Sequence, residues 1–231
     1  MADLEIIQVP PPKNTKKNKN DPRLPDIEKG SMGFILGPVR SGKSTIIANL
    51  LMNKKFFKKQ FDLIYLISPT VYYDDTIRHV RELDNILLFD KYDDSIVEAL
   101  IEAQGENPKD EKQRICLILD DMVGYGRSSN VFNLGTRYRH YGIKLLLYST
   151  QLYKSLPNAV RDNFDFAIFL GIQHNDNEIL KIVDELSGIF SSAQEFEKIF
   201  RDCTSERHQF LYLNTTFNPP RVYKNFTQRL K

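Results

Sequence analysis

The chain contains the run Gly37-Pro38-Val39-Arg40-Ser41-Gly42-Lys43-Ser44, and this run decides the fold class. It matches the phosphate-binding pattern G-x-x-x-x-G-K-[ST] without a gap. Gly37 and Gly42 allow the backbone to curl, so that successive N–H groups point at a β-phosphate, at the positive end of the following helix. Lys43 brings a charge to the β- and γ-phosphate oxygens, and the Ser44 hydroxyl binds Mg²⁺. The run therefore predicts a site for ATP and Mg²⁺.

The surroundings of this run are those that a phosphate loop requires. An apolar strand is expected at residues 32–36 before it, and an amphipathic helix at about 42–53 after it. Strands and helices then alternate, which predicts right-handed crossovers and an α/β fold with a mostly parallel central sheet and helices on both faces. The further strands are expected at 61–68, 86–89, 115–119, 143–149, 164–170, 209–213 and 222–226. The further helices are expected at 94–104, 131–141, 175–188 and 192–200.

Two acids follow the continuous apolar strand Ile115–Leu119. Asp120 stands at the carboxyl end of this strand, where ligands bind in parallel sheets, and is expected to hold Mg²⁺ through water. Asp121 is expected to orient and deprotonate the attacking water, although a helix N-cap or loop acid is the alternative. Gln151 follows the next strand, and its amide can both donate and accept beside the γ-phosphate; a simple strand-end turn is the alternative.

Length and composition fit one soluble α/β domain. The chain has 231 residues, of which 41% are hydrophobic and 27% charged, and its net charge is +2. No apolar run reaches the 18 or so residues of a membrane span, and we expect no membrane anchor. Cys116 and Cys203 lack metal-ligand spacing, which favours reduced core thiols.

Residues 1–31 differ in composition from the rest of the chain. Three prolines at 10–12 lead into a polar, basic stretch at 13–20 without apolar periodicity. Such a stretch buries too little surface to offset the entropy of ordering. We therefore expect a basic N-terminal arm at 1–31, either a solubilising leader or a contact to DNA or a partner, and an ATPase domain at 32–231.

With these residues in view, the sequence resembles the genome-packaging ATPases of large nucleocytoplasmic DNA viruses, poxviruses and virophages, a branch of the FtsK/HerA superfamily. The resemblance runs from about Leu24 to Arg221. Its carriers are Gly37–Thr45, Ser68-Pro69-Thr70, Leu119-Asp120-Asp121-Met122, Arg139-His140, Ser149-Thr150-Gln151, and Leu156-Pro157 with Arg161 and Asn163. A departure is Arg40, which stands where that family usually has a small residue.

The resemblance implies a RecA-like core that assembles with itself as a ring, a pentamer or hexamer, around double-stranded DNA. It implies a place at a viral capsid or portal vertex, in the virion or in viral factories of the host cytoplasm. An arginine from the neighbouring subunit would complete each site. Arg139 and Arg161 match arginines of the family pattern and Arg137 is nearby, and each of them has a surface or salt-bridging role as its alternative.

Two further segments are candidates for DNA contact. Lys54–Lys59 combines four lysines with Phe56 and Phe57, a mixture suited to phosphates and stacking. Its alternative is a helix end whose lysines complement the dipole. The loop at 124–130 suits either a pore or an ordinary surface.

The sequence thus favours an oligomeric ATPase that translocates DNA for genome packaging. A P-loop kinase of small molecules is one alternative, and a nucleotide-gated binding protein without motor activity is another. Stimulation of ATP hydrolysis by duplex DNA distinguishes the first from the other two.

Overall fold

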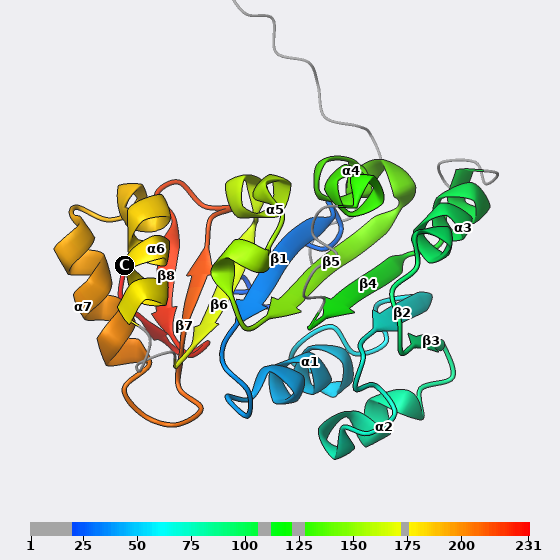
Figure 1. Cartoon of the computed structure of the whole chain (residues 1–231), viewed down its shortest axis with the longest axis horizontal. Coiled ribbons are helices and arrows are strands. Elements are labelled where there is room, and N and C mark those ends of the chain that lie inside the picture. The colour runs from blue at the N-terminus through cyan, green and yellow to red at the C-terminus, as the bar shows by residue number, and fades with distance from the viewer. Residues whose placement is uncertain (1–19, 106–111, 122–127, 172–175) are drawn as a thin grey trace, which may run out of the picture.

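The computed structural model describes residues 20–105, 112–121, 128–171 and 176–231. Its centre is a nine-stranded sheet in the order β3-β2-β4-β5-β1-β6-β7-β8-β9 (Figure 1). The strands from β3 to β6 in this order are parallel, and β7, β8 and β9 continue the sheet antiparallel. The predicted α/β fold with a mostly parallel sheet is confirmed. The strands are β1 Ser31–Leu36, β2 Leu63–Ile67, β3 Ile86–Phe89, β4 Ile115–Asp120, β5 Ile143–Thr150, β6 Phe166–Leu170, β7 Phe210–Asn214, β8 Arg221–Lys224 and β9 Gln228–Arg229.

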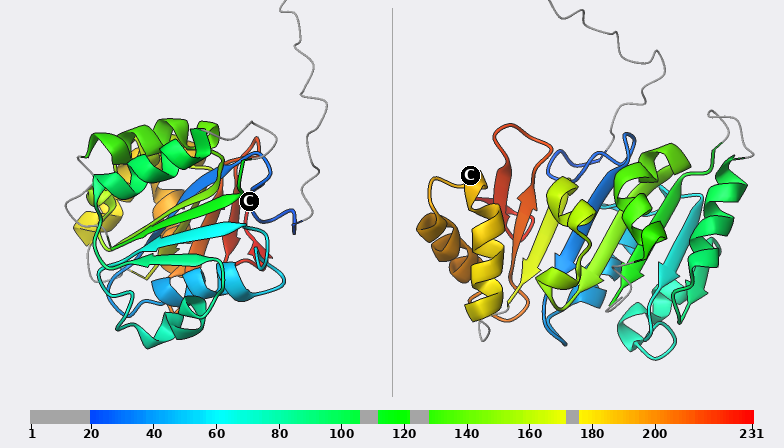
Figure 2. Two further views of the ribbon diagram at one scale, coloured as in Figure 1. Left: turned by 90° about the vertical axis from the view of Figure 1, so that its right-hand side faces the viewer. Right: turned by 45° about the horizontal axis from the view of Figure 1, so that its top comes forward.

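Helices cover both faces of this sheet, as the edge-on view in Figure 2 shows. Side chains alternate along each strand, so Phe34 belongs to one hydrophobic core and its neighbour Ile35 to the other. The first core contains buried residues of α3 Asp94–Gly105, α4 Ser129–Arg137, α5 Asn158–Asn163, α6 Asp176–Leu186 and α7 Ala193–Cys203. The second contains those of α1 Lys43–Met52 and α2 Arg78–Arg81.

The central strands are apolar because both of their faces are covered. Every residue of β1, β4 and β6 is buried, and apart from Ser31 and Asp120 at the strand ends their sequences are apolar. Cys116 and Cys203 are buried free thiols within the two cores. No helix in the described part of the chain is long and apolar enough to span a membrane.

The segment before β1 packs against the domain, although the sequence suggested an arm as far as residue 31. Leu24 is 5% exposed and Ile27 fully buried. The carbonyl oxygen of Arg23 accepts hydrogen bonds from Tyr212 Oη at 2.7 Å and from Asn214 Nδ2 at 3.0 Å. Residues 20–31 thus contribute to the core, whereas 1–19 lie outside the described residues.

Short elements account for the other differences from the sequence expectations. The 3₁₀ turn Asp75–Ile77 with α2, the helix α5 and the strand β9 carry too few residues for a periodic signal. The helix expected at 131–141 divides into α4 and a 3₁₀ turn, Tyr138–Tyr141. Residue 175 and most of the loop at 124–130 lie outside the described residues.

Candidate active site

The phosphate loop, residues 37–45, connects the carboxyl end of β1 to α1. Gly42 has φ 111° and caps the amino end of α1, a conformation that favours glycine. A Cβ atom at Gly37 would lie 2.6 Å from Ser41 Oγ and 2.7 Å from Leu170 Cβ. Both glycines of the motif are therefore required by the backbone path, one by its φ and one by close packing.

The ammonium group of Lys43 lies over this loop. Its Nζ donates hydrogen bonds to the carbonyl oxygens of Gly37 at 2.9 Å and Pro38 at 3.1 Å. Burial lowers the pKa of Lys43 below its ordinary value, and the nearby carboxylates of Asp120 and Asp121 oppose this shift. The cation thus stands where the loop amides would receive phosphate oxygens.

A cleft of about 730 Å³ opens beside the loop. Carboxyl ends of neighbouring parallel strands meet at one edge of a sheet, and here β4, β5 and β1 are neighbours. The cleft is accordingly lined by Lys43, Asp120, Asp121 and Gln151, residues that the sequence placed in one site. Val39, Arg40, Gly42, Ser44 and Thr45 of the loop complete this side.

Asp120 offers a carboxylate with an unused oxygen. The side chain is 7% exposed, and Ser68 Oγ donates to its Oδ2 at 2.9 Å. Its Oδ1 is buried and has no hydrogen-bond partner among the described residues. Burial raises the pKa of Asp120, while the hydroxyls of Ser149 and Ser68 and the charge of Lys43 oppose this shift. A carboxylate of this kind, in a residue that lines the cleft together with Ser44, fits a hard cation such as Mg²⁺, with the Ser44 hydroxyl as the second protein group.

Asp121 is held in a left-handed conformation next to Gln151. Its φ is 50°, and its backbone N–H donates to the carbonyl oxygen of Ser149 at 2.8 Å. Gln151 Nε2 donates to both carboxylate oxygens of Asp121, at 3.1 Å each. The ends of β4 and β5 are thereby joined through a carboxylate–amide pair inside the cleft.

Five lining residues were not predicted as site residues: Thr70, Tyr73, Asp74, Thr76 and His208. Although burial opposes it, the pKa of Asp74 is lowered by hydrogen bonds from the Ser44 hydroxyl and from Thr76. His208 Nδ1 lies 3.2 Å from the carbonyl oxygen of Ser41. Only Thr70 had a sequence signal, within the Ser68-Pro69-Thr70 run.

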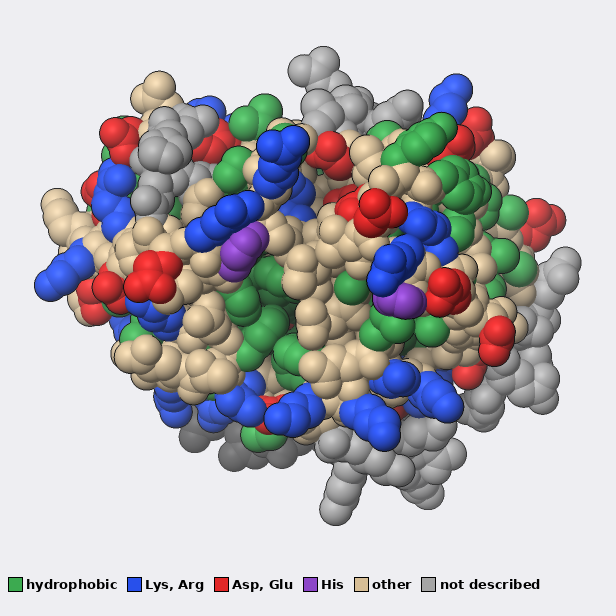
Figure 3. Space-filling model, turned by 90° about the horizontal axis from the view of Figure 1, so that it is seen from below, with side chains coloured by type: hydrophobic (Ala, Val, Ile, Leu, Met, Phe, Trp, Pro, Cys, Tyr) green, Lys and Arg blue, Asp and Glu red, His purple; other side chains and the backbone are tan. Residues whose placement is uncertain are grey.

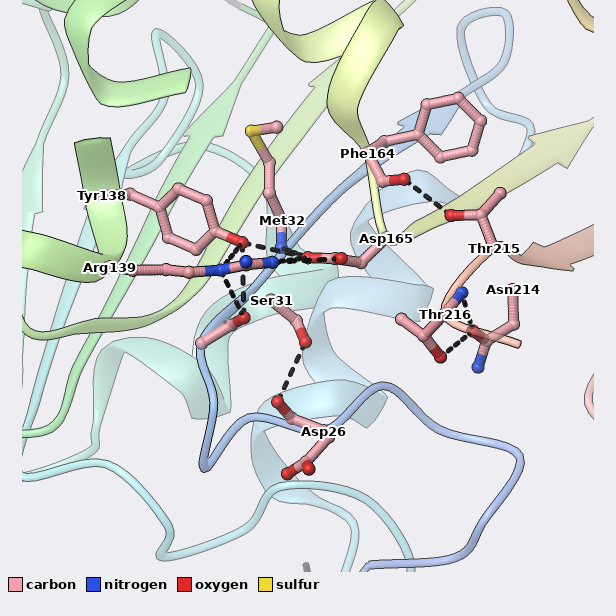
Figure 4. Close-up of polar contacts among 11 residues, drawn as sticks. Asp26, Ser31, Met32, Tyr138, Arg139, Phe164, Asp165, Asn214, Thr215 and Thr216 are labelled. Atoms are coloured by element: carbon pink, nitrogen blue, oxygen red, sulfur yellow. Dashed lines mark hydrogen bonds and ion pairs between the residues drawn. The ribbon is translucent and has the colours of Figure 1, made fainter. Parts of the chain in front are cut away.

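Arg139 lies at the opposite edge of the sheet from the cleft, at the amino ends of β1 and β6 (Figure 4). Its Nη2 contacts both Asp165 carboxylate oxygens, at 3.1 and 3.2 Å. Its Nε donates to Gly30 O at 3.1 Å and to Tyr138 Oη at 2.9 Å. The side chain remains 54% exposed.

Arg161 in α5 is more enclosed, with 11% of its side chain exposed. It forms an ion pair with Glu185 and lies over the ring of Tyr153, 5.5 Å from the ring centroid. Neither Arg139 nor Arg161 lines the cleft of its own chain. Arg40 does line the cleft of its own chain, and its φ is 62°. Arg137 is exposed in the last turn of α4.

A phosphate loop after a central parallel strand, with acids at the end of a nearby strand, defines the P-loop NTPase class. The chain belongs to the Poxvirus A32 protein family, whose model matches residues 29–224.

A curated relative is uncharacterized protein 088R of Invertebrate iridescent virus 3, 27% identical over 94% of this chain and 83% of that protein. Among solved structures, the genome packaging NTPase B204 of Sulfolobus turreted icosahedral virus 2, in complex with ATP-γS, has a TM-score of 0.61. It is 16% identical and covers 86% of this chain and 98% of its own. The DNA-packaging ATPase B204 of Sulfolobus Turreted Icosahedral Virus has a TM-score of 0.59 at 19% identity, over 84% and 97% of the two chains. At these identities the structures establish a shared fold.

Proposed function

We propose that the chain is an ATP-hydrolysing motor that moves double-stranded DNA into a viral capsid. The observation that carries this proposal is the convergence of Lys43, Asp120 and the Asp121–Gln151 pair on one cleft. Membership of a poxvirus family supports it, as does a fold shared with structures described as genome-packaging NTPases.

In this proposal the loop amides and Lys43 bind the β- and γ-phosphates. When bound, Mg²⁺ would be held by Ser44 and Asp120 and would neutralise charge on the phosphate oxygens. Asp121 accepts the proton of the attacking water, and Gln151 fixes the orientation of that carboxylate. Because Asp120 is buried, its carboxylate would be available to that Mg²⁺ ion rather than to solvent.

We further propose that the working form is a ring, with the cleft of each subunit at an interface. Two exposed apolar side chains line the cleft, Val39 at 65% and Tyr73 at 84% exposure, and Leu152, which follows Gln151 in the sequence, is 48% exposed. Exposed apolar side chains at a cleft favour a protein interface there. A neighbouring arginine would complete the site, and Arg139 suits this role better than Arg161 because more of it is exposed.

A basic groove is the proposed DNA contact within the described residues. It has a volume of about 1270 Å³ and begins at Asn20, where the basic segment 1–19 joins the domain. Arg23 and Arg114 in its lining are paired with Asp21 and Glu28. Its remaining cations are Lys54, Lys55 and Lys59, with Phe56 among them. We also propose that the protein acts at a viral capsid or portal vertex, in viral factories or in virions.

The deciding experiment is ATP turnover by the full-length protein with and without double-stranded DNA. Stimulation by DNA, abolished by Lys43→Ala, is the expected result. Transfer of phosphate to a small molecule would indicate a kinase. Slow turnover that is indifferent to DNA would indicate a nucleotide-gated binding protein.

A further inference from the structure

A buried carboxylate of α6 holds the backbone that follows Gln151. Glu178 lies in the first turn of α6 and is 2% exposed. Its Oε1 accepts a hydrogen bond from the backbone N–H of Tyr153, which begins the 3₁₀ turn Tyr153–Ser155, and its Oε2 accepts from Lys181 Nζ at 3.1 Å. A buried charge is tolerated only while such partners stay in place, so Glu178 fixes the turn relative to α6.

A second carboxylate of the same helix binds this turn. Glu185 forms ion pairs with Lys154 in the turn and with Arg161 in α5, and Arg161 Nη1 lies 2.6 Å from Glu185 Oε2. The guanidinium of Arg161 also lies over the ring of Tyr153, which is fully buried. Although burial opposes it, the hydrogen bonds from Lys154 and Arg161 lower the pKa of Glu185 below its ordinary value. Charged side chains thus join the turn, α5 and α6.

The residue before Gln151 is tied to the phosphate loop. The carbonyl oxygen of Thr150 accepts a hydrogen bond from the Gly37 N–H at 3.1 Å, and Thr150 Oγ1 lies 2.6 Å from Ser155 Oγ. The parallel strands end at the bottom of Figure 1, and Figure 3 views this edge, where charged side chains of both signs surround a depression. Gln151 is therefore held between the phosphate loop on one side and the turn fixed by α6 on the other.

We infer that Glu178 and Glu185 are positioning residues, which set the amide of Gln151 against the carboxylate of Asp121. The inference rests on the proposed function, because it takes the Asp121–Gln151 pair to act on the attacking water. Gln151 Nε2 lies 3.1 Å from each Asp121 oxygen, so a displacement of the end of β5 by about 1 Å would break the contact. The inference also gives a role to Arg161, which the sequence marked and which does not line the cleft.

The test compares two variants of Glu178 in the full-length protein. Glu178→Gln keeps an oxygen that accepts the Tyr153 N–H, whereas Glu178→Met replaces it by a thioether of similar size, which is a weak acceptor. Glu178→Met should lower kcat by about 10- to 100-fold, the effect of a displaced catalytic group, and change KM for ATP only a few-fold. Glu178→Gln should stay within a few-fold of wild type. Equal kcat of the two variants would contradict the role of this hydrogen bond.

A double-mutant cycle distinguishes positioning of Gln151 from a general loss of stability. Glu185→Gln removes the charge that pairs with Lys154 and Arg161, and it should lower kcat when Gln151 is present. In Gln151→Ala, which has no amide left to position, it should have little further effect. Asp184→Asn, at the exposed acid next to Glu185, is the matched control and should be neutral in both backgrounds. Additive losses in the cycle overturn the inference.

The dependence of turnover on Lys43 separates the two ways in which the experiment can fail. Where wild type hydrolyses ATP and Lys43→Ala does not, a normal kcat of Glu178→Met overturns the positioning role alone. Where wild type shows no turnover that depends on Lys43, the proposed function and this inference fall together.

Discussion

The side-chain amide of Gln151 donates to both carboxylate oxygens of Asp121, at 3.1 Å each. A neutral donor holds this carboxylate in one orientation without adding a charge beside it. Gln151→Glu replaces the donor by a second negative charge of the same size and should reduce ATP turnover by about 100-fold or more, the range of a misplaced general base. ATP affinity, measured separately, should change only a few-fold. Turnover equal to wild type would remove Gln151 from the mechanism.

Lys43→Ala should lower ATP turnover by on the order of 100- to 1000-fold, because the developing charge on the γ-phosphate loses its fixed cation. The measurement is steady-state phosphate release at saturating ATP. Lys58→Ala, at a lysine that does not line the phosphate cleft, is the control for loss of a positive charge. A variant within a few-fold of wild type would contradict the phosphate-site assignment.

Asp120→Asn should stabilise the nucleotide-free protein while removing Mg²⁺-dependent ATP binding. Burial raises the pKa of Asp120 above its ordinary value of 3.8, so the ionised form disfavours folding. This cost is absent below pH 3.8, grows as pH rises from 3.8 to the folded-state pKa, and is constant above it. Thermal unfolding at pH 7 should therefore show a higher Tm for the variant, and the difference should vanish in acid. A lower Tm at pH 7 would contradict this account.

Two truncations should show that residues 1–19 contribute less to the stability of the domain than residues 20–27. Deletion of residues 1–19 should leave the Tm and ATP binding of the domain close to those of the full chain. Deletion of 1–27 removes the buried side chains of Leu24 and Ile27, each worth about 1.5–3 kcal/mol of stability. Equal stability of the two truncated proteins would show that these side chains do not hold the domain together.

Arg139→Ala should bind ATP and hydrolyse it poorly if Arg139 completes the site of a neighbour, a contribution of about 10³–10⁵ in rate. Co-expressed with Asp121→Asn, it should recover part of the activity. Some interfaces then combine a cleft that has Asp121 with a neighbouring subunit that has Arg139. Arg137→Ala, an exposed arginine nearby, is the matched control.

Arg139 also pairs with Asp165, so the Tm of the variant must be compared with that of wild type. A stable Arg139→Ala ring that no mixture rescues would exclude this arginine. Full activity of a monomer would exclude the shared site.

The parts of the site that could be predicted from sequence are those defined by local patterns. Gly37 and Gly42 stand close together in the sequence, and Asp120 directly follows an uninterrupted apolar run. Each pattern can therefore be recognised within a few residues. Asp74 and His208 could not be found in this way, since they reach the loop from segments far along the chain.

Long-range pairing also explains why the roles of the arginines were open. The sequence distinguishes poorly between Arg139 and Arg161. In the fold, Glu185, which lies 24 residues beyond Arg161, forms an ion pair with it, and only 11% of the Arg161 side chain is exposed. Leu24 and Ile27 stand among polar residues, so no periodicity marked them as core. Their burial depends on a surface that only the folded sheet and α1 provide.

Phe56, Phe210 and Phe226 line both the basic groove and an apolar hollow of about 480 Å³ that borders the phosphate loop at Gly42 and Thr45. Phe226 stands edge-on to the other two, with ring centroids 5.1 Å from Phe56 and 5.0 Å from Phe210. These three rings form an aromatic partition between the groove and the hollow. A ligand in one of these spaces that rotates a ring therefore changes the wall of the other. Such coupling is reciprocal: the factor by which an occupant of the groove changes nucleotide affinity equals the factor by which nucleotide changes binding in the groove. If the groove holds DNA, as proposed, these rings give a physical route by which DNA in the groove and nucleotide at the phosphate loop change each other's affinity within a single subunit.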